Sequence, residues 1–153
     1  MPMRRYFVLT LFLLLSVGGG LLSGIYNMPG EWYAGLAKPP FNPPNWIFGP
    51  VWTVLYVLIG IAGWRTWERR RHGVAMQLWF AQMVLNFAWS PVFFTWHAIG
   101  IALAIIVALL LAVVAFITVS WNRDRVGAWL FVPYAAWVAF ATMLNASLLF
   151  LNP

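Results

Sequence analysis

Five long apolar runs, almost free of charge, limit what this chain can fold into. They cover residues 6–26, 48–67, 74–96, 99–121 and 126–151, nearly the whole chain of 153 residues. Only 8% of the residues are charged, whereas a soluble domain carries roughly 25%. A surface so poor in charge cannot be solvated. The composition therefore excludes an ordinary soluble domain, a disordered chain and a nucleic-acid-binding protein, despite a net charge of +6.

Each run is long enough for a membrane-crossing helix, which needs about 20 apolar residues. The strands of a membrane β-barrel would instead alternate in polarity over about 10 residues, and residues 101–119 show no such alternation. We therefore predict an all-α integral membrane protein with one domain over residues 1–153. Its five transmembrane helices form a bundle, and residues 27–47 form a long structured loop between the first and second helices.

The first run follows Arg4 and Arg5, as the apolar part of a signal peptide would. It is too long for that role, and no Ala-x-Ala-like cleavage site ends it. We expect an uncleaved first helix.

The basic residues indicate the orientation in the membrane. With five crossings, the N-terminus and the second and fourth loops share one side. That side holds Arg4, Arg5, Arg65, Arg69, Arg70, Arg71, Arg123 and Arg125, and the other side holds only Lys38. The positive-inside rule then places the N-terminus in the cytoplasm and the C-terminus outside. The pattern and the short C-terminus favour a bacterial plasma (inner) membrane.

The loop at residues 27–47 contains two Pro-Pro pairs, at 39–40 and 43–44, which prevent one continuous helix. It also contains Trp32, Tyr33, Leu36, Phe41 and Trp46, so it is too apolar for a solvated tether. Long structured loops in small domains are usually functional. We expect a lid folded onto the outer end of the bundle.

Small residues recur at four-residue spacing in two of the runs. Gly20 and Gly24 form a GxxxG pattern in the first, and the fourth carries Gly100, Ala104, Ala108 and Ala112. Such ridges allow close helix approach. Packing inside one bundle and a homodimer seam on the fourth helix are both compatible with the pattern.

Eleven tryptophans exceed what interfacial belts explain, because Trp89 and Trp137 lie well inside predicted helices. Polar residues accompany them on shared helix faces. One face carries Asn86, Trp89 and Phe93, and another carries Tyr134, Trp137, Ala141 and Asn145. Two interpretations are compatible with each other: hydrogen bonds between helices, and a pocket with aromatic walls and a few polar anchors.

The sequence lacks the residues that ion transport, metal binding and common kinds of catalysis require. No ionisable side chain lies deep in any run, so a proton relay or an ion-coupled transporter is not expected. His72 and His97 lie near loops on opposite sides, without metal-ligand spacing. The sequence contains no nucleophile triad, carboxylate pair or phosphate-binding loop. We predict neither a metal site nor a required cofactor.

Motifs in three parts of the chain resemble the TspO/MBR family. The lid and the second run contain Trp32-Tyr33, Lys38-Pro39, Pro43-Pro44, Val51-Trp52 and Leu55-Tyr56. The third run contains Leu85-Asn86, Trp89-Ser90-Pro91 and Phe93-Phe94, and the fifth contains Val132-Pro133-Tyr134, Trp137, Phe140-Ala141-Thr142 and Leu144-Asn145. The similarity extends over almost the whole length.

The resemblance implies a five-helix bundle, often a homodimer, that binds tetrapyrroles such as protoporphyrin IX and haem precursors under the lid. Benzodiazepine-site drugs bind some members. Matched by motif, the ligand-binding residues are Tyr33, Trp52, Asn86, Trp89, Phe93, Trp137, Ala141 and Asn145. Trp52 and Trp137 match two tryptophans linked in the family to light-dependent porphyrin breakdown, which makes them candidate catalytic residues.

One departure concerns sterols. Animal members end the fifth helix with a cholesterol-recognition motif that contains Tyr and Arg, and neither residue follows Leu144 here. Sterol binding is therefore not expected. We expect a tetrapyrrole receptor or regulator that also aids transport. The alternatives are a light-dependent porphyrin-degrading enzyme and a structural or partner-binding membrane subunit.

Overall fold

The computed structural model describes residues 2–153, and this part of the chain is helical without strands. The first helical stretch consists of α1 (Pro2–Leu13), a π-helical segment (Leu14–Gly18) and α2 (Gly19–Tyr26). The other helices are α3 (Glu31–Ala34), α4 (Asn45–Arg70), α5 (Val74–Ser90), α6 (Ile99–Ser120) and α7 (Arg125–Leu151), and a π-helical segment (Pro91–Thr95) continues α5. The prediction of an all-α chain is confirmed.

Four helical stretches are long and apolar enough to cross a membrane: Pro2–Tyr26, Asn45–Arg70, Ile99–Ser120 and Arg125–Leu151. Their bounds agree within a few residues with four of the apolar runs. The remaining run, at residues 74–96, contains α5, which has only 17 residues before Pro91. Proline lacks the N–H that would continue the α-helical pattern. The helix continues instead with wider π-helical turns, in which the N–H of Trp96 donates to the carbonyl of Pro91 at 2.9 Å.

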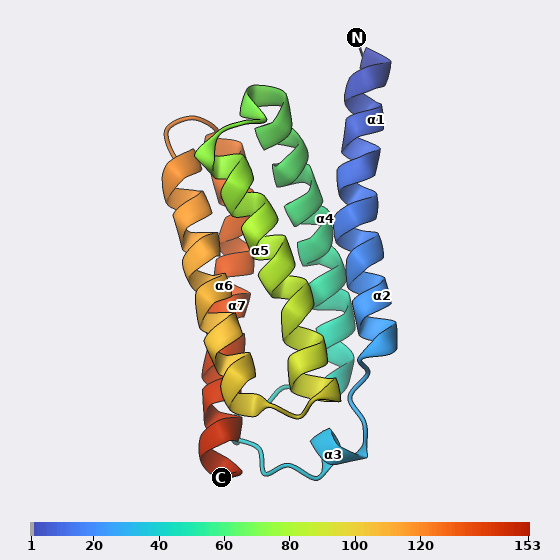
Figure 1. Cartoon of the computed structure of the whole chain (residues 1–153), viewed down its shortest axis with the longest axis vertical. Helices are drawn as coiled ribbons and strands as arrows, with labels where there is room; N and C mark the ends of the chain where they lie inside the picture. Colours follow the sequence, from blue (N-terminus) through green and yellow to red (C-terminus); the bar gives the residue numbers. More distant parts are fainter. Residues whose placement is uncertain (1) are drawn as a thin grey trace.

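The long helices are arranged in a ring, and their order around this ring differs from their order in the chain (Figure 1). α4 packs between α1 and α7, and α6 packs between α7 and α5, while α2 contacts α5 and completes the ring. The N-terminus lies at one end of the bundle, and α3 and the C-terminus lie at the other.

Close approach of α1 and α4 depends on glycines of α4. A Cβ atom on Gly63 would lie 2.5 Å from the Trp79 ring and 2.7 Å from the Phe12 ring. A Cβ atom on Gly60 would lie 2.7 Å from Oγ of Ser16. Ser16 is fully buried in the π-helical segment and donates to the carbonyl oxygen of Tyr56 at 2.8 Å. These positions have no room for larger residues.

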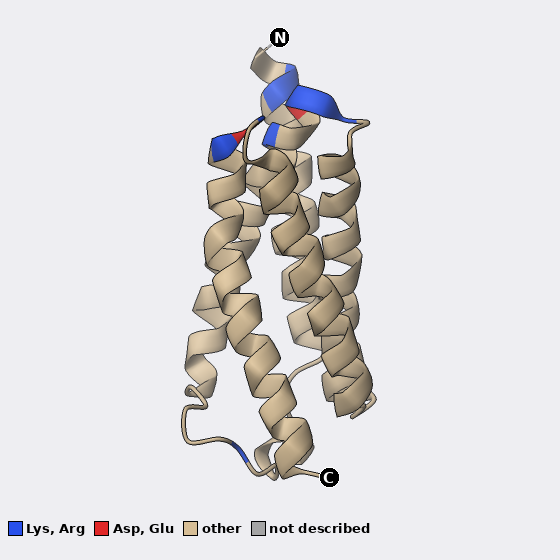
Figure 2. Ribbon diagram, turned by 90° about the vertical axis from the view of Figure 1, so that its left-hand side faces the viewer, with Lys and Arg blue, Asp and Glu red and all other residues tan. Residues whose placement is uncertain are grey.

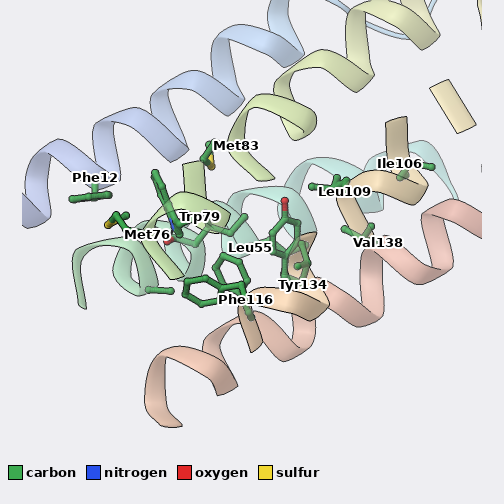
Figure 3. Close-up of a cluster of buried hydrophobic side chains, with 14 residues drawn as sticks. Phe12, Leu55, Met76, Trp79, Met83, Ile106, Leu109, Phe116, Tyr134 and Val138 are labelled. Atoms are coloured by element: carbon green, nitrogen blue, oxygen red, sulfur yellow. Dashed lines mark hydrogen bonds between the residues drawn. The ribbon is translucent and has the colours of Figure 1, made fainter. Parts of the chain in front are cut away.

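The main core occupies the middle of the bundle and its N-terminal end (Figure 3). Phe12 and Trp79 pack edge to face at 5.0 Å, and Phe116 and Phe131 have ring centroids 4.1 Å apart. The indole of Trp79 is fully buried and donates to the carbonyl of Ile59 at 2.9 Å. The side chains of this core are closely packed across α1, α4, α5, α6 and α7.

Charge is concentrated at one end of the described chain (Figure 2). The arginines gather at the end with the N-terminus, and Lys38 lies at the opposite end, as the predicted topology requires. Within the arginine-rich end, Asp124 has only 7% of its side chain exposed. Nη2 of Arg65 donates to Oδ1 of Asp124 at 2.8 Å, and Nε of Arg69 lies 3.5 Å from Oδ2. The pair joins the end of α4 to the start of α7.

The environment of Asp124 lowers its carboxyl pKa. Burial alone would raise this pKa, but hydrogen bonds from Arg65 and the backbone of Gly127, with the charges of Arg65 and Arg69, outweigh burial. The pKa of Asp124 is therefore below its usual value of 3.8. The ionised form stabilises the native state.

Replacing Gly63 with alanine is expected to lower the free energy of unfolding by about 1–3 kcal/mol, because the new methyl group overlaps the Trp79 and Phe12 rings. Gly18→Ala is the matched control, since a Cβ there meets nothing within 4 Å. It should be neutral or stabilising by up to about 1 kcal/mol. Thermal unfolding of the purified variants in detergent measures both changes. Equal effects would contradict the close α1–α4 packing.

Acid should remove the contribution of Asp124 to stability. A lowered native pKa gives stability that is fully present above the unfolded pKa and lost as the pH falls through the native value. At neutral pH we expect Asp124→Asn to lower the free energy of unfolding by about 1–3 kcal/mol. The difference from wild type should narrow as the pH falls below 3.8 and through the lowered native pKa of Asp124. Unfolding curves of both proteins across this range provide the measurement, and a difference independent of pH would contradict the ion-pair account.

Candidate ligand-binding cavity

A cavity of about 540 Å³ occupies the half of the bundle next to α3 and the C-terminus. Its walls come from α2, α4, α5 with its π-helical continuation, α6 and α7, and residues of the α2–α4 segment close its end. Most ligand pockets have volumes of about 300–1,000 Å³, so the cavity is large enough for a drug-sized or cofactor-sized molecule.

All eight residues predicted for the site line this one cavity. They are Tyr33 of α3, Trp52 of α4, Asn86 and Trp89 of α5, Phe93 of the π-helical segment, and Trp137, Ala141 and Asn145 of α7. Residues from segments far apart in the sequence therefore share one wall surface. Their role in binding a ligand stays a prediction.

The aromatic walls have defined geometry. The rings of Trp89 and Phe93 stack with centroids 4.9 Å apart and an interplanar angle of 22°. The ring of Trp137 meets that of Phe48 edge to face at 5.8 Å, and Trp52 meets Tyr56 at 5.4 Å. Packing against one another fixes these rings, so flat apolar surfaces face the cavity without further rearrangement.

A chain of hydrogen bonds crosses the bundle at the inner end of the cavity. The hydroxyl of Tyr56 donates to Oδ1 of Asn86 at 2.6 Å. Nδ2 of Asn86 donates to the hydroxyl of Tyr134 at 2.7 Å, and this hydroxyl donates to Oε1 of Gln82 at 2.7 Å. The chain links α4, α5 and α7 and fixes the amide of Asn86 at the cavity wall.

A second pair of bonds fixes the wall near the C-terminal end. Nε1 of Trp89 donates to Oδ1 of Asn145 at 2.9 Å, and Nδ2 of Asn145 donates to the carbonyl of Ile99 at 3.1 Å. The predicted hydrogen bonds between helices are therefore present, and they support the walls of the same cavity. The same polar residues therefore form hydrogen bonds between helices and line a cavity with aromatic walls.

The segment between α2 and α4 is tied to the bundle at several points. Nδ2 of Asn152 donates to the carbonyl of Ala37, and the N–H of Ala37 donates to Oδ1 of Asn152, both at 2.9 Å. The ring of Trp32 stacks on His97 with centroids 4.1 Å apart. Nζ of Lys38 donates to the carbonyl of Tyr33 at 2.7 Å. The single cation of this end therefore caps α3, and His97 is an exposed stacking partner.

Two buried polar atoms of cavity residues have no hydrogen-bond partner among the described residues. They are Nε1 of Trp137, a donor, and Oδ1 of Asn42, an acceptor. An unpaired buried polar group is unfavourable by about 1–3 kcal/mol. A ligand that offers an acceptor and a donor would remove this penalty.

Sequence reasoning missed part of the cavity. Tyr56 lies in a motif already noted, and Asn42 lies in the lid, but neither was assigned to the site. The wall formed by α2, including Gly20, Ser23 and Gly24, was also missed. The sequence could have indicated Tyr56 as a cavity residue, because it is a polar residue inside an apolar run. The α2 wall could not have been predicted, because it depends on which helices are neighbours in the bundle.

Known proteins are similar to this chain over most of its length. The model of the TspO/MBR family matches residues 11–151. Protein CrtK of Rhodobacter capsulatus is 36% identical over 152 residues, which cover 95% of this chain and 94% of the relative. The tryptophan-rich sensory protein of Cereibacter sphaeroides is 36% identical, covering 98% and 95%, and the human translocator protein is 39% identical, covering 75% and 71%.

Tyr134→Phe tests the buried hydrogen-bond chain. The variant keeps the ring but leaves Nδ2 of Asn86 and Oε1 of Gln82 without their shared partner. We expect the free energy of unfolding to fall by about 1–3 kcal/mol. Tyr6→Phe is the control, because Tyr6 is 65% exposed and should show no change. Chemical unfolding in detergent measures both, and equal stability of the two variants would contradict the chain.

Proposed function

The chain belongs to the TspO/MBR family, and on this premise we propose that it is a membrane receptor or regulator that binds tetrapyrroles and aids their transport. The binding site is the cavity under the α2–α4 segment. One observation carries the proposal: eight residues matched by family motif, from α3, α4, α5 with its continuation and α7, converge on one cavity of about 540 Å³. Protoporphyrin IX and haem precursors are the expected ligands.

A planar macrocycle suits the walls of this cavity. Its faces would lie against the indoles of Trp52, Trp89 and Trp137, and each aromatic pair would add roughly 0.5–1.5 kcal/mol beyond the burial of apolar area. The walls offer few polar groups, as expected for a site that takes a mostly apolar ligand. The stacked rings of Trp89 and Phe93 and the tilted contact of Trp52 with Tyr56 supply a preorganised surface.

The unpaired polar atoms match groups that a porphyrin carries. One propionate oxygen can accept from Nε1 of Trp137, and the O–H of a protonated propionic acid can donate to Oδ1 of Asn42. Both bonds would satisfy atoms that are now buried without partners. This complementarity supports a ligand with polar groups at its edge over a pure hydrocarbon such as a sterol nucleus. Benzodiazepine-site drugs, which carry carbonyl acceptors, are further candidate ligands.

We also propose the membrane arrangement. α5 and its π-helical continuation run from Val74 to Thr95 and form the fifth crossing, beside the four stretches described above. The arginine-rich end is cytoplasmic and the α3 end lies outside, in a bacterial plasma membrane. Gly100 and Ala104 are exposed on α6, so this helix offers a small-residue face for a homodimer.

Light-dependent degradation of the bound porphyrin is the second candidate function. The observation that favours it is the position of Trp52 and Trp137, which both line the cavity. The porphyrin would absorb the light, and the chain would hold it beside oxidisable indoles. Comparing products from illuminated and dark samples distinguishes this activity from binding alone.

Trp137→Phe is expected to weaken binding of protoporphyrin IX about tenfold, because the variant loses the indole N–H and part of the aromatic wall. Quenching of tryptophan fluorescence by protoporphyrin IX, in the dark, measures the affinity. Trp129→Phe is the matched control on the same helix, since Trp129 is 56% exposed and does not line the cavity. It should bind as wild type does.

Linear, non-saturable quenching that is identical in wild type and both variants would contradict the proposal. Porphyrin would then only partition into the micelle, and a structural or partner-binding role would replace the receptor function. Saturable binding with equal affinity in all three proteins would place the site elsewhere.

A further inference from the structure

Between Trp32 and Ala37, the α2–α4 segment is firmly attached to the bundle at the end of the cavity. Ala37 and Asn152 exchange two hydrogen bonds of 2.9 Å, which attach the segment to the C-terminus of α7. Trp32 stacks on His97, and Tyr33 is buried with Phe93 and Leu148 in a second small core. A ligand that arrived from the aqueous side would have to break these contacts together.

The side between α2 and α5 is closed. Gly19 of α2 lies directly against the ring of Phe87 of α5, with no space for a Cβ atom. At the end of α2, the hydroxyl of Thr95 donates to Oδ1 of Asn27 at 2.7 Å. These contacts hold the two helices together at both ends of α2.

The side between α2 and α4 differs. These helices lie side by side in the lower right of Figure 1, and Gly20 of α2 lies against the ring of Tyr56 of α4. One turn further toward the α2–α4 segment, a Cβ atom on Gly24 would meet nothing within 4 Å. A Cβ atom on Gly49 of α4 would also meet nothing within this distance. Both glycines line the cavity. At these two positions the helices therefore leave space between them.

The exposure of the cavity lining agrees with an open side. Leu21 and Ile25 of α2 line the cavity and are 56% and 65% exposed. Thr53 of α4 also lines the cavity and is exposed. The cavity thus reaches the outer face of two helical stretches, Pro2–Tyr26 and Asn45–Arg70, which are each long and apolar enough to cross a membrane, where lipid chains would surround them.

We infer that the gap between α2 and α4, framed by Gly24 and Gly49, is a lateral portal through which ligand passes between the bilayer and the cavity. The inference rests on the proposed function and specifies it. The ligand is a planar amphiphile already dissolved in the membrane, and the α2–α4 segment remains attached while the ligand passes. The glycines keep the portal open because any side chain there would project into the path.

Rate measurements test the portal. Wild type, Gly24→Phe, Gly49→Phe and the double variant are placed in lipid nanodiscs, and binding of protoporphyrin IX is followed by stopped-flow tryptophan quenching. Association and dissociation should both slow about tenfold or more in the double variant, with much less change in Kd. Gly18→Phe is the matched control, because Gly18 also meets nothing within 4 Å but does not line the cavity. It should keep the rates of wild type.

A second arm tests the alternative route under the segment. The chain has no cysteine, so Ala37→Cys with Asn152→Cys introduces a unique pair that a short bis-maleimide can join. The portal predicts that cross-linking leaves the association rate within about twofold of the unlinked protein. Slower association after cross-linking, or equal rates in the Gly18 control and the double variant, would overturn the portal while leaving saturable binding intact. Absence of saturable binding to wild type would instead overturn the proposed function, and the portal with it.

Discussion

A buried polar side chain is costly to leave without a hydrogen-bond partner. The chain of bonds from Tyr56 through Asn86 and Tyr134 to Gln82 pairs such groups across three helices and leaves Nε2 of Gln82 without a partner among the described residues. Because each bond fixes the next, α4, α5 and α7 are held in one relative position. The aromatic walls of the cavity are carried by the same three helices, so their arrangement depends on this chain.

Aromatic residues and glycines occur in both halves of the bundle, but their packing differs between the halves. In the half near the N-terminus, the Phe12 and Trp79 rings pack closely against each other and against Gly63 of α4. In the other half, Trp52, Trp89 and Trp137 surround a cavity, and glycines of α2 and α4 leave one side open. Close packing in the first half holds α1 against α4. The continuous helical stretch then positions α2 beside the cavity.

Much of the fold and of the candidate site follows from the sequence, but for different reasons. Apolar length alone predicts the four long stretches, because a membrane crossing sets a minimum length. The candidate site residues on α4, α5 and α7 come from the resemblance to the TspO/MBR family, and helix periodicity independently places Asn86, Trp89 and Phe93 on one face. Ala37 and Asn152 could not be paired from the sequence, because their contact joins segments 115 positions apart.

Local irregularities were also beyond prediction. The π-helical segment at Leu14–Gly18 lies where the Ser16 hydroxyl bonds to α4, which is a tertiary contact. The spacing of Gly20 and Gly24 indicated one packing ridge, yet Gly20 lies against Tyr56 and Gly24 faces open space. Spacing shows that two small residues share a helix face, but only the position of the neighbouring helix shows which of them it contacts.

A structure of the chain crystallised from a lipidic phase with protoporphyrin IX would test the central claim most directly. The account predicts macrocycle density inside the cavity, with its face against the indole of Trp52, Trp89 or Trp137 and a polar group within hydrogen-bond distance of Nε1 of Trp137. Macrocycle density confined to the lipid-facing surface, with the cavity filled by side chains or lipid, would contradict it.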